Sequence, residues 1–190
     1  MLTHRQQSFI ATLKEPGDSV HFLGALLGKP ARVKRGALGG GIFTGAIQHR
    51  DDSHFLGFVE GQAAKADTPL TLYFRHHDEG FRLYVRSPGP YHGRGIARAD
   101  DNTIGAFIIG ERNPGLFHID HFTGVPLTVD HLHADIVPVV LRADNGNHLH
   151  LQRLHDSPHT YVAATGGEPM PFHLHVHETN AAYLNEPDEV

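Results

Sequence analysis

Short runs in which apolar and polar residues alternate, or in which β-branched and aromatic residues dominate, recur along most of the chain. Such runs are typical of β-strands when turn-forming residues bound them. Clusters of Gly, Pro, Asn and Asp separate the runs, and these residues favour turns because they tolerate or preset the backbone angles that a turn needs. We therefore expect strands at Leu70–Arg75, Phe81–Arg86, Ala106–Ile109, Val137–Arg142, Leu149–Leu154 and Phe172–Val176.

A helical pattern is weak by comparison. No stretch keeps a 3.6-residue apolar period over three turns, and the best helical candidate, Gln6–Lys14, fits a first strand equally well. The sequence therefore predicts an all-β protein, and we expect residues 1–190 to form a single domain with internal repeats.

Two kinds of internal similarity suggest how the strands are organised. The segment HFLG at 21–24 recurs at 54–57, and the stretches that begin at Leu72 and Val139 both read as strand, glycine-containing polar turn, strand. A unit of about 32 residues, doubled to about 64 and taken three times, accounts for the full length. Six hairpins in three pairs predict a β-trefoil-like closed barrel, which leaves no exposed edge strands. A β-sandwich or jelly roll is the alternative.

Residues 70–178 also carry a family resemblance. The phrases VVLRADNGNHLHLQ and TYVAATGGEPMPFHLHV resemble the repeat unit of fascin-like β-trefoils, in which an apolar strand precedes an Asn–Gly turn and a Phe-x-Leu/Val strand follows. The chain has no tryptophan, so the Gln-x-Trp signature of the ricin-type branch is absent. The resemblance implies a binding or scaffolding role, and it carries no catalytic residue over to this chain.

Composition and charge narrow the range of partners. With 16 Lys+Arg against 21 Asp+Glu, the formal charge is −5, which argues against nucleic acid because phosphate binding needs an excess of basic residues. No apolar run approaches the roughly 20 residues of a membrane-spanning helix. The chain has no cysteine and its first residues lack the apolar core of a signal peptide, so we expect a cytoplasmic protein. Non-classical secretion and oligomerisation are left open.

Histidine is the unusual component, with 18 of the 190 residues. In the segment 173–177 it occupies every second position, so on a strand three imidazoles share one face. Two imidazoles at this spacing can chelate Zn, Ni or Cu when a third ligand joins them, whereas a solvated strand face explains the same alternation without a metal. The candidate metal ligands, all at this spacing, are His131, His133, His148, His150, His173, His175 and His177. We expect no cofactor, with one of these metals as the alternative.

Searches for catalytic patterns favour a protein that is not an enzyme. No serine lies in a G-x-S-x-G turn, and no His-x-His pair is followed by the glutamate that a cupin metal site requires. The carboxylate pairs Asp51-Asp52 and Asp100-Asp101 lie in turn-like segments, where aspartate is expected to bond to the local backbone.

The leading hypothesis is therefore a non-catalytic binding protein, lectin-like or protein-binding, that uses turn and loop residues to hold a glycan or a protein ligand. A histidine-rich metal-binding protein or metal-dependent enzyme is the alternative. The candidate ligand-binding residues, all polar or aromatic side chains in or beside predicted turns, are His76, His77, Asp78, Tyr91, Asp144, Asn145, Asn147, His148 and Tyr161.

Overall fold

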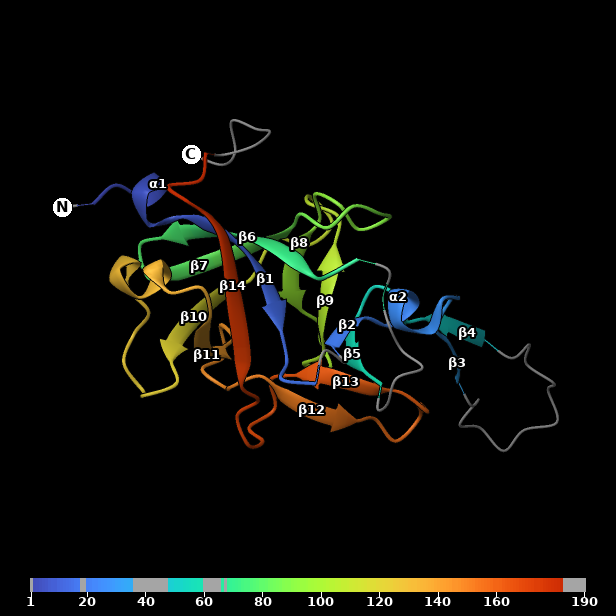
Figure 1. Cartoon of the computed structure of the whole chain (residues 1–190). Coiled ribbons are helices and arrows are strands. Elements are labelled where there is room, and N and C mark those ends of the chain that lie inside the picture. The colour runs from blue at the N-terminus through green and yellow to red at the C-terminus, as the bar shows by residue number, and fades with distance from the viewer. Residues whose placement is uncertain (1, 18–19, 36–47, 60–65, 67, 183–190) are drawn as a thin grey trace, which may run out of the picture.

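The computed structural model describes residues 2–17, 20–35, 48–59, 66 and 68–182. Over these residues strands dominate, and the expected all-β class is confirmed. Six antiparallel strands form a closed barrel: β1 (Phe9–Lys14), β6 (Thr71–His77), β7 (Gly80–Val85), β10 (Leu116–His121), β11 (Val137–Arg142) and β14 (Phe172–Thr179). The order around the barrel is β10–β11–β14–β1–β6–β7, and β7 pairs back with β10 (Figure 1).

Further strands extend the barrel on one side. The pair β8 (Gly95–Arg98) and β9 (Ile104–Phe107) continues from β7. A four-stranded sheet has the order β12 (His150–Arg153), β13 (Thr160–Ala163), β5 (Leu56–Phe58), β2 (Val20–Phe22). A separate hairpin, β3 (Arg32–Arg35) and β4 (Gln48–Asp51), lies beyond this sheet (Figure 1).

Helical segments in the described chain are short. They are α1 (His4–Gln7), α2 (Leu23–Leu27) and the 3₁₀-helix η1 (Val129–His133). The helix α1 packs against β6, and α2 contacts β2 and β5. Among the described residues, no helix is long and apolar enough to cross a membrane.

The segment Gln6–Lys14, which fitted a helix and a strand equally well, contains both. The Thr3 hydroxyl accepts a hydrogen bond from the Gln6 amide at 3.2 Å, and the Gln6 side chain accepts one from the Thr3 amide at 2.9 Å. This capping box starts α1, which ends at Gln7. From Phe9 onward the chain lies between β14 and β6, where pairing on both sides holds it as a strand.

The other predicted strands are present with small shifts in their limits. The segment expected at Ala106–Ile109 ends earlier, because β9 stops at Phe107 and the next two isoleucines lie exposed in a turn. Apolar side chains alone therefore did not mark the end of this strand. The closed barrel is confirmed, whereas its division into three repeats of about 64 residues stays a prediction.

Aromatic side chains fill the barrel where it closes. Phe9 stacks on Phe74 with 4.6 Å between ring centroids, and it meets Phe81 edge to face at 5.6 Å. Phe81 in turn pairs in register with Phe117, across the junction of β7 and β10. These rings are almost fully buried, so their burial supplies a large apolar contribution at the seam that completes the barrel.

The two HFLG segments lie side by side as antiparallel neighbours. In the pairing of β2 with β5, His21 stands opposite Gly57 and Phe22 opposite Leu56. The pairing continues past β2, because the Leu23 amide donates to the carbonyl of Phe55 at 2.9 Å. A Cβ atom at position 57 would lie 2.2 Å from Cδ2 of Leu23, so that leucine occupies the space a side chain would need. The two copies of the repeated HFLG segment therefore pack against each other in the folded chain.

This close packing predicts that Gly57→Ala destabilises the fold. The added methyl group must displace Leu23 or the backbone of β13, since the Thr160 carbonyl oxygen would lie 2.9 Å away. We expect a loss of about 1–3 kcal/mol in the free energy of unfolding, measured by urea denaturation. Gly115→Ala is the matched control, because its Cβ would find its nearest neighbour at an ordinary 3.4 Å. Equal stability of the two variants would contradict the packing described here.

Candidate functional site

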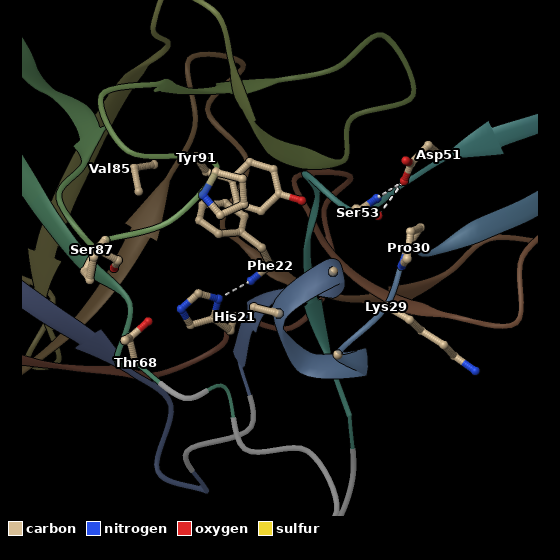
Figure 2. Close-up of a pocket in the computed structure, with 15 residues that line it drawn as sticks. His21, Phe22, Lys29, Pro30, Asp51, Ser53, Thr68, Val85, Ser87 and Tyr91 are labelled. Atoms are coloured by element: carbon tan, nitrogen blue, oxygen red, sulfur yellow. Dashed lines mark hydrogen bonds between the residues drawn. The ribbon is translucent and has the colours of Figure 1, made fainter.

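The best candidate for a functional site is a cavity of ≈ 630 Å³ beside α2, which we call the α2 pocket (Figure 2). It lies between α2, the turn that joins β4 to β5, and the loop that follows β7. Its apolar wall is formed by Phe22, Ala25, Pro30, Val85, Pro88 and Pro90. Its polar side chains are His21, Lys29, Asp51, Ser53, Thr68, Ser87 and Tyr91. This size, and an apolar wall with a few polar groups, are typical of small-molecule sites.

Two glycines allow α2 to form one side of the pocket. A Cβ atom at Gly24 would lie 2.9 Å from Cβ of Ser53 and 3.0 Å from the Tyr91 hydroxyl oxygen, so only glycine lets the helix approach both. The helix ends at Gly28, whose φ of 61° is the left-handed conformation that glycine adopts without strain. The chain can then turn directly into Lys29 and Pro30 at the pocket's edge.

His21 is the most informative side chain in the pocket. It is 6% exposed and lies on β2, and its Nδ1 accepts a hydrogen bond from the Phe22 amide at 2.8 Å (Figure 2). Because Nδ1 is an acceptor, the neutral ring carries its proton on Nε2. Nε2 is buried and forms no hydrogen bond of good geometry with any described residue. The backbone of Thr68 supplies a weaker hydrogen bond to the imidazole, and Nε2 itself is closed off from the open space of the pocket.

Burial also fixes the charge of His21. It lowers the pKa of the imidazole to about 4, and the hydrogen bond with the backbone of Thr68 opposes this only in part. At neutral pH the ring is uncharged, so Nε2–H is a neutral donor.

The turn between β4 and β5 supplies a carboxylate at the exposed side of the pocket. One oxygen of Asp51, Oδ1, accepts hydrogen bonds from the Ser53 amide at 3.0 Å and from the Ser53 hydroxyl at 2.5 Å (Figure 2). These two bonds lower the pKa of Asp51, which is therefore ionised at neutral pH. The Ser53 hydroxyl oxygen also accepts from the Ala31 amide at 2.8 Å, so the turn is held rigidly.

Tyr91 is held by contacts to its ring. The Phe22 ring lies 4.7 Å from it, and the guanidinium carbon of Arg94 lies 5.2 Å from its centroid. Burial, with a smaller contribution from the charge of Asp51, raises the pKa of its phenol, so the hydroxyl stays protonated. Tyr91 was predicted to bind a ligand, and it is the member of that set that lines the α2 pocket.

The remaining predicted ligand residues contact other elements. His76 and Asp78 both reach α1, where His4 Nδ1 lies 2.8 Å from His76 Nδ1 and His4 Nε2 lies 3.2 Å from an Asp78 oxygen. His77 ends β6 beside them. These side chains attach the N-terminal helix to the end of the barrel.

The turn between β11 and β12 is tied to neighbouring loops. Asp144 accepts a hydrogen bond from Arg98 at 2.8 Å, and the side-chain amides of Asn145 and Asn147 donate to the Ala164 carbonyl at 2.8 and 3.3 Å. His148 follows in the same turn, where its backbone bridges to Arg142. These bonds tie the turn to Arg98 at the end of β8 and to Ala164 just after β13.

Tyr161 is fully buried and has a structural role. Its hydroxyl donates to Asp52, which also receives a two-pronged ion pair from Arg50 at 2.6 and 2.9 Å. The hydroxyl of Ser157 lies 2.6 Å from the same phenol, and burial together with Asp52 raises the Tyr161 pKa. This network fastens β4 to β13, and with it the adjacent residue Asp51. Tyr161 also belongs to a second apolar cluster, which the sequence did not indicate.

The predicted metal ligands do not gather into one centre. The imidazoles of β14 share the outer face as predicted, while Phe172 and Leu174 are buried inside the barrel. Among all the residues that the structure describes, no three histidine, aspartate or glutamate side chains form a group that could hold a metal ion. The structure therefore gives the metal prediction no support.

Individual contacts of these histidines have local explanations. His177 Nε2 lies 2.6 Å from the Thr12 hydroxyl on β1, and His150 Nε2 lies 2.9 Å from the Thr165 hydroxyl. On η1, His131 stacks on His121 with 5.1 Å between ring centroids, and His133 ends the same helix. His173 stands opposite Pro138 of β11 and Lys14 of β1.

Sequence reasoning missed the polar residues of the α2 pocket apart from Tyr91. The missed residues are His21, Lys29, Asp51, Ser53, Thr68 and Ser87. His21 was visible only as part of the repeated HFLG segment. One signal could have indicated it: His21 stands between apolar residues in a run where polar and apolar residues do not alternate. Such a run is typical of a strand that is buried on both faces, and every residue of β2 is buried.

Comparisons of the chain with known protein families, with curated proteins and with solved structures find no match. The resemblance to fascin-like β-trefoils therefore stays a prediction. The assignment of the site rests on the geometry of the α2 pocket itself.

The burial of His21 predicts that the free energy of unfolding decreases as the pH falls. Its folded-state pKa of about 4 lies below the unfolded value of 6.5, so the folded state binds fewer protons. The stability that this difference contributes is fully present above pH 6.5 and is lost as the pH falls toward 4. We expect a loss of about 3 kcal/mol across that interval, measured by urea denaturation at several pH values.

The variant His21→Leu removes the titrating group and should flatten this part of the pH profile. His92→Gln replaces an exposed histidine of the loop after β7 and serves as the control. A profile of His21→Leu that still falls as steeply as the wild type would show that another group causes the loss.

Proposed function

We propose that the chain is a non-catalytic binding protein and that a small hydroxylated ligand, such as a sugar unit, occupies the α2 pocket. The observation that carries this proposal is the α2 pocket itself, a cavity of ≈ 630 Å³ in which Asp51 and Tyr91 stand beside an apolar wall.

The remaining polar groups of the pocket are suited to binding hydroxyl groups. Asp51 presents a fixed, ionised carboxylate that accepts hydrogen bonds, and Tyr91 presents a protonated phenol that can donate or accept. The apolar wall beside them offers contact area to a sugar ring. The resemblance to fascin-like β-trefoils, which implies a binding role, supports the same conclusion.

A saccharide panel tests this proposal. Saturation-transfer NMR with glucose, galactose, mannose, xylose and the N-acetylated forms of the first two should detect binding of at least one sugar. Ala25→Phe places a ring in the pocket from α2 and should abolish the signal. Leu27→Phe is the matched control, because Leu27 lies on the same helix but packs against the second apolar cluster.

The outcomes separate clearly. Binding that is lost in Ala25→Phe and kept in Leu27→Phe supports the proposal. Absence of binding for the whole panel, or binding that Ala25→Phe leaves unchanged, overturns it.

A further inference from the structure

The hairpin of β3 and β4 carries exposed positive charge beside the α2 pocket. On β3, Val33 is buried and its neighbours Arg32 and Lys34 are exposed, so these two side chains share the outer face of the hairpin. Lys29 precedes the same strand and lines the pocket, and Figure 2 shows its side chain extending outward from the pocket's edge. These cations are concentrated within a chain whose formal charge is −5.

This charged face is continuous with the pocket. In the pairing of the two strands, Arg32 stands opposite Asp51 and Lys34 stands opposite His49, and directly opposed residues of an antiparallel pair lie on the same face. Asp51 also lines the pocket, so the next pair outward along the hairpin is His49 with Lys34. We call this surface the β3–β4 face, and its members are Lys29, Arg32, Lys34, His49 and Asp51.

The cations of the β3–β4 face are not neutralised by neighbouring carboxylates. None of Lys29, Arg32 and Lys34 forms an ion pair with any residue that the structure describes. Three cations against the single carboxylate of Asp51 give the face a net positive charge. A partner with spaced negative charges therefore fits this surface.

The charge and its position beside the pocket favour an acidic polysaccharide. A sugar unit in the α2 pocket that belongs to a longer chain would direct its next units along the β3–β4 face. Arg32 and Lys34 are two positions apart on one strand, about 7 Å, which is close to the length of one sugar unit. A uronate chain carries one carboxylate on each ring, so its charges match this spacing. A guanidinium group also binds a carboxylate through two parallel hydrogen bonds.

Resting on the proposed function, we infer that the ligand is a uronate polysaccharide that binds through the α2 pocket and the β3–β4 face together. One sugar unit occupies the pocket. There Oδ1 of Asp51 is engaged by Ser53, and Oδ2 accepts a hydrogen bond from a ring hydroxyl. The carboxylates of the following units lie against Arg32 and Lys34. An anionic membrane would engage the same cations without filling the pocket, so the pocket distinguishes the two partners.

A matched pair of ligands isolates the effect of charge. Short oligomers of galacturonate, mannuronate and glucuronate are each compared with their methyl esters, which keep the sugar rings and remove the charge. Calorimetric titration should show at least one acid form binding about tenfold more tightly than its ester, because two or three exposed ion pairs together contribute that much. This preference should shrink as the ionic strength rises from about 0.05 M to about 0.5 M, since salt screens exposed charges. Equal affinities for acid and ester would overturn the inference.

A double variant assigns the preference to the hairpin. Arg32→Gln combined with Lys34→Gln should reduce the preference for the acid form to about twofold or less, and both side chains are exposed, so the fold should be retained. Arg5→Gln combined with Arg153→Gln is the matched control, because it removes the same charge from exposed residues of α1 and β12. The control should keep the tenfold preference. A preference that survives in the hairpin variant, or that the control loses equally, would contradict the assigned surface.

Two further probes test other anionic partners. Vesicles that contain phosphatidylglycerol present a charged lipid surface, and a sulfated oligosaccharide of similar length presents a different anion. Binding to the vesicles without binding to any uronate oligomer would assign the face to a membrane. Tighter binding of the sulfated oligomer than of every uronate would assign it to sulfate. Either result would overturn the inference.

Failure of this inference differs from failure of the proposed function. If acid and ester bind equally and Ala25→Phe abolishes the binding of both, the proposed function stands and this inference falls. If no sugar binds, or if Ala25→Phe leaves binding unchanged, the proposed function falls. This inference then falls with it, because it places a sugar unit in the pocket.

Discussion

The backbone pairing between β2 and β5 holds three parts of the α2 pocket in place at once. It sets His21 opposite Gly57, it ties the first turn of α2 to the carbonyls of Phe55 and Ser53, and it fixes the turn that carries Asp51. Leu23 packs where position 57 has no side chain, so the approach of the two segments depends on that glycine. Without this pairing neither the buried donor nor the helix beside it would have a defined position.

A buried polar network secures the same region from the other side. Asp52 is fully buried, and its partners Arg50 and Tyr161 join β4 to β13. Separating the partners of such a network would leave a buried charge unpaired. Because that is costly, the partners stay together and β4 is held against β13. Two neighbouring aspartates therefore have different roles: Asp52 bonds to Arg50 and Tyr161 inside the protein, and Asp51 lines the pocket.

The sequence was sufficient to predict the strands that have one buried face and one exposed face. On β14 the alternation of buried Phe172 and Leu174 with surface histidines follows from the pleat, and β11 was predicted with its observed limits. The pocket was not predictable in this way. His21 lies on a strand that is buried on both faces, so its apolar and polar residues do not alternate and the pattern gives no signal. Tyr161 lies beside a predicted turn in the sequence, but residues far away along the chain pack over it and bury it. The HFLG repeat held the relevant signal, but pairing between its copies depends on contacts between residues far apart in sequence.

His21 is a neutral, buried imidazole with its proton on Nε2, and its nitrogen chemical shifts report both the charge and the tautomer of the ring. Long-range ¹H–¹⁵N NMR spectra distinguish the two neutral tautomers and the charged ring. We expect the Nε2–H tautomer at pH 7, with the ring still mostly neutral at pH 5. A proton on Nδ1 at pH 7, or a ring that is charged at pH 6, would contradict it.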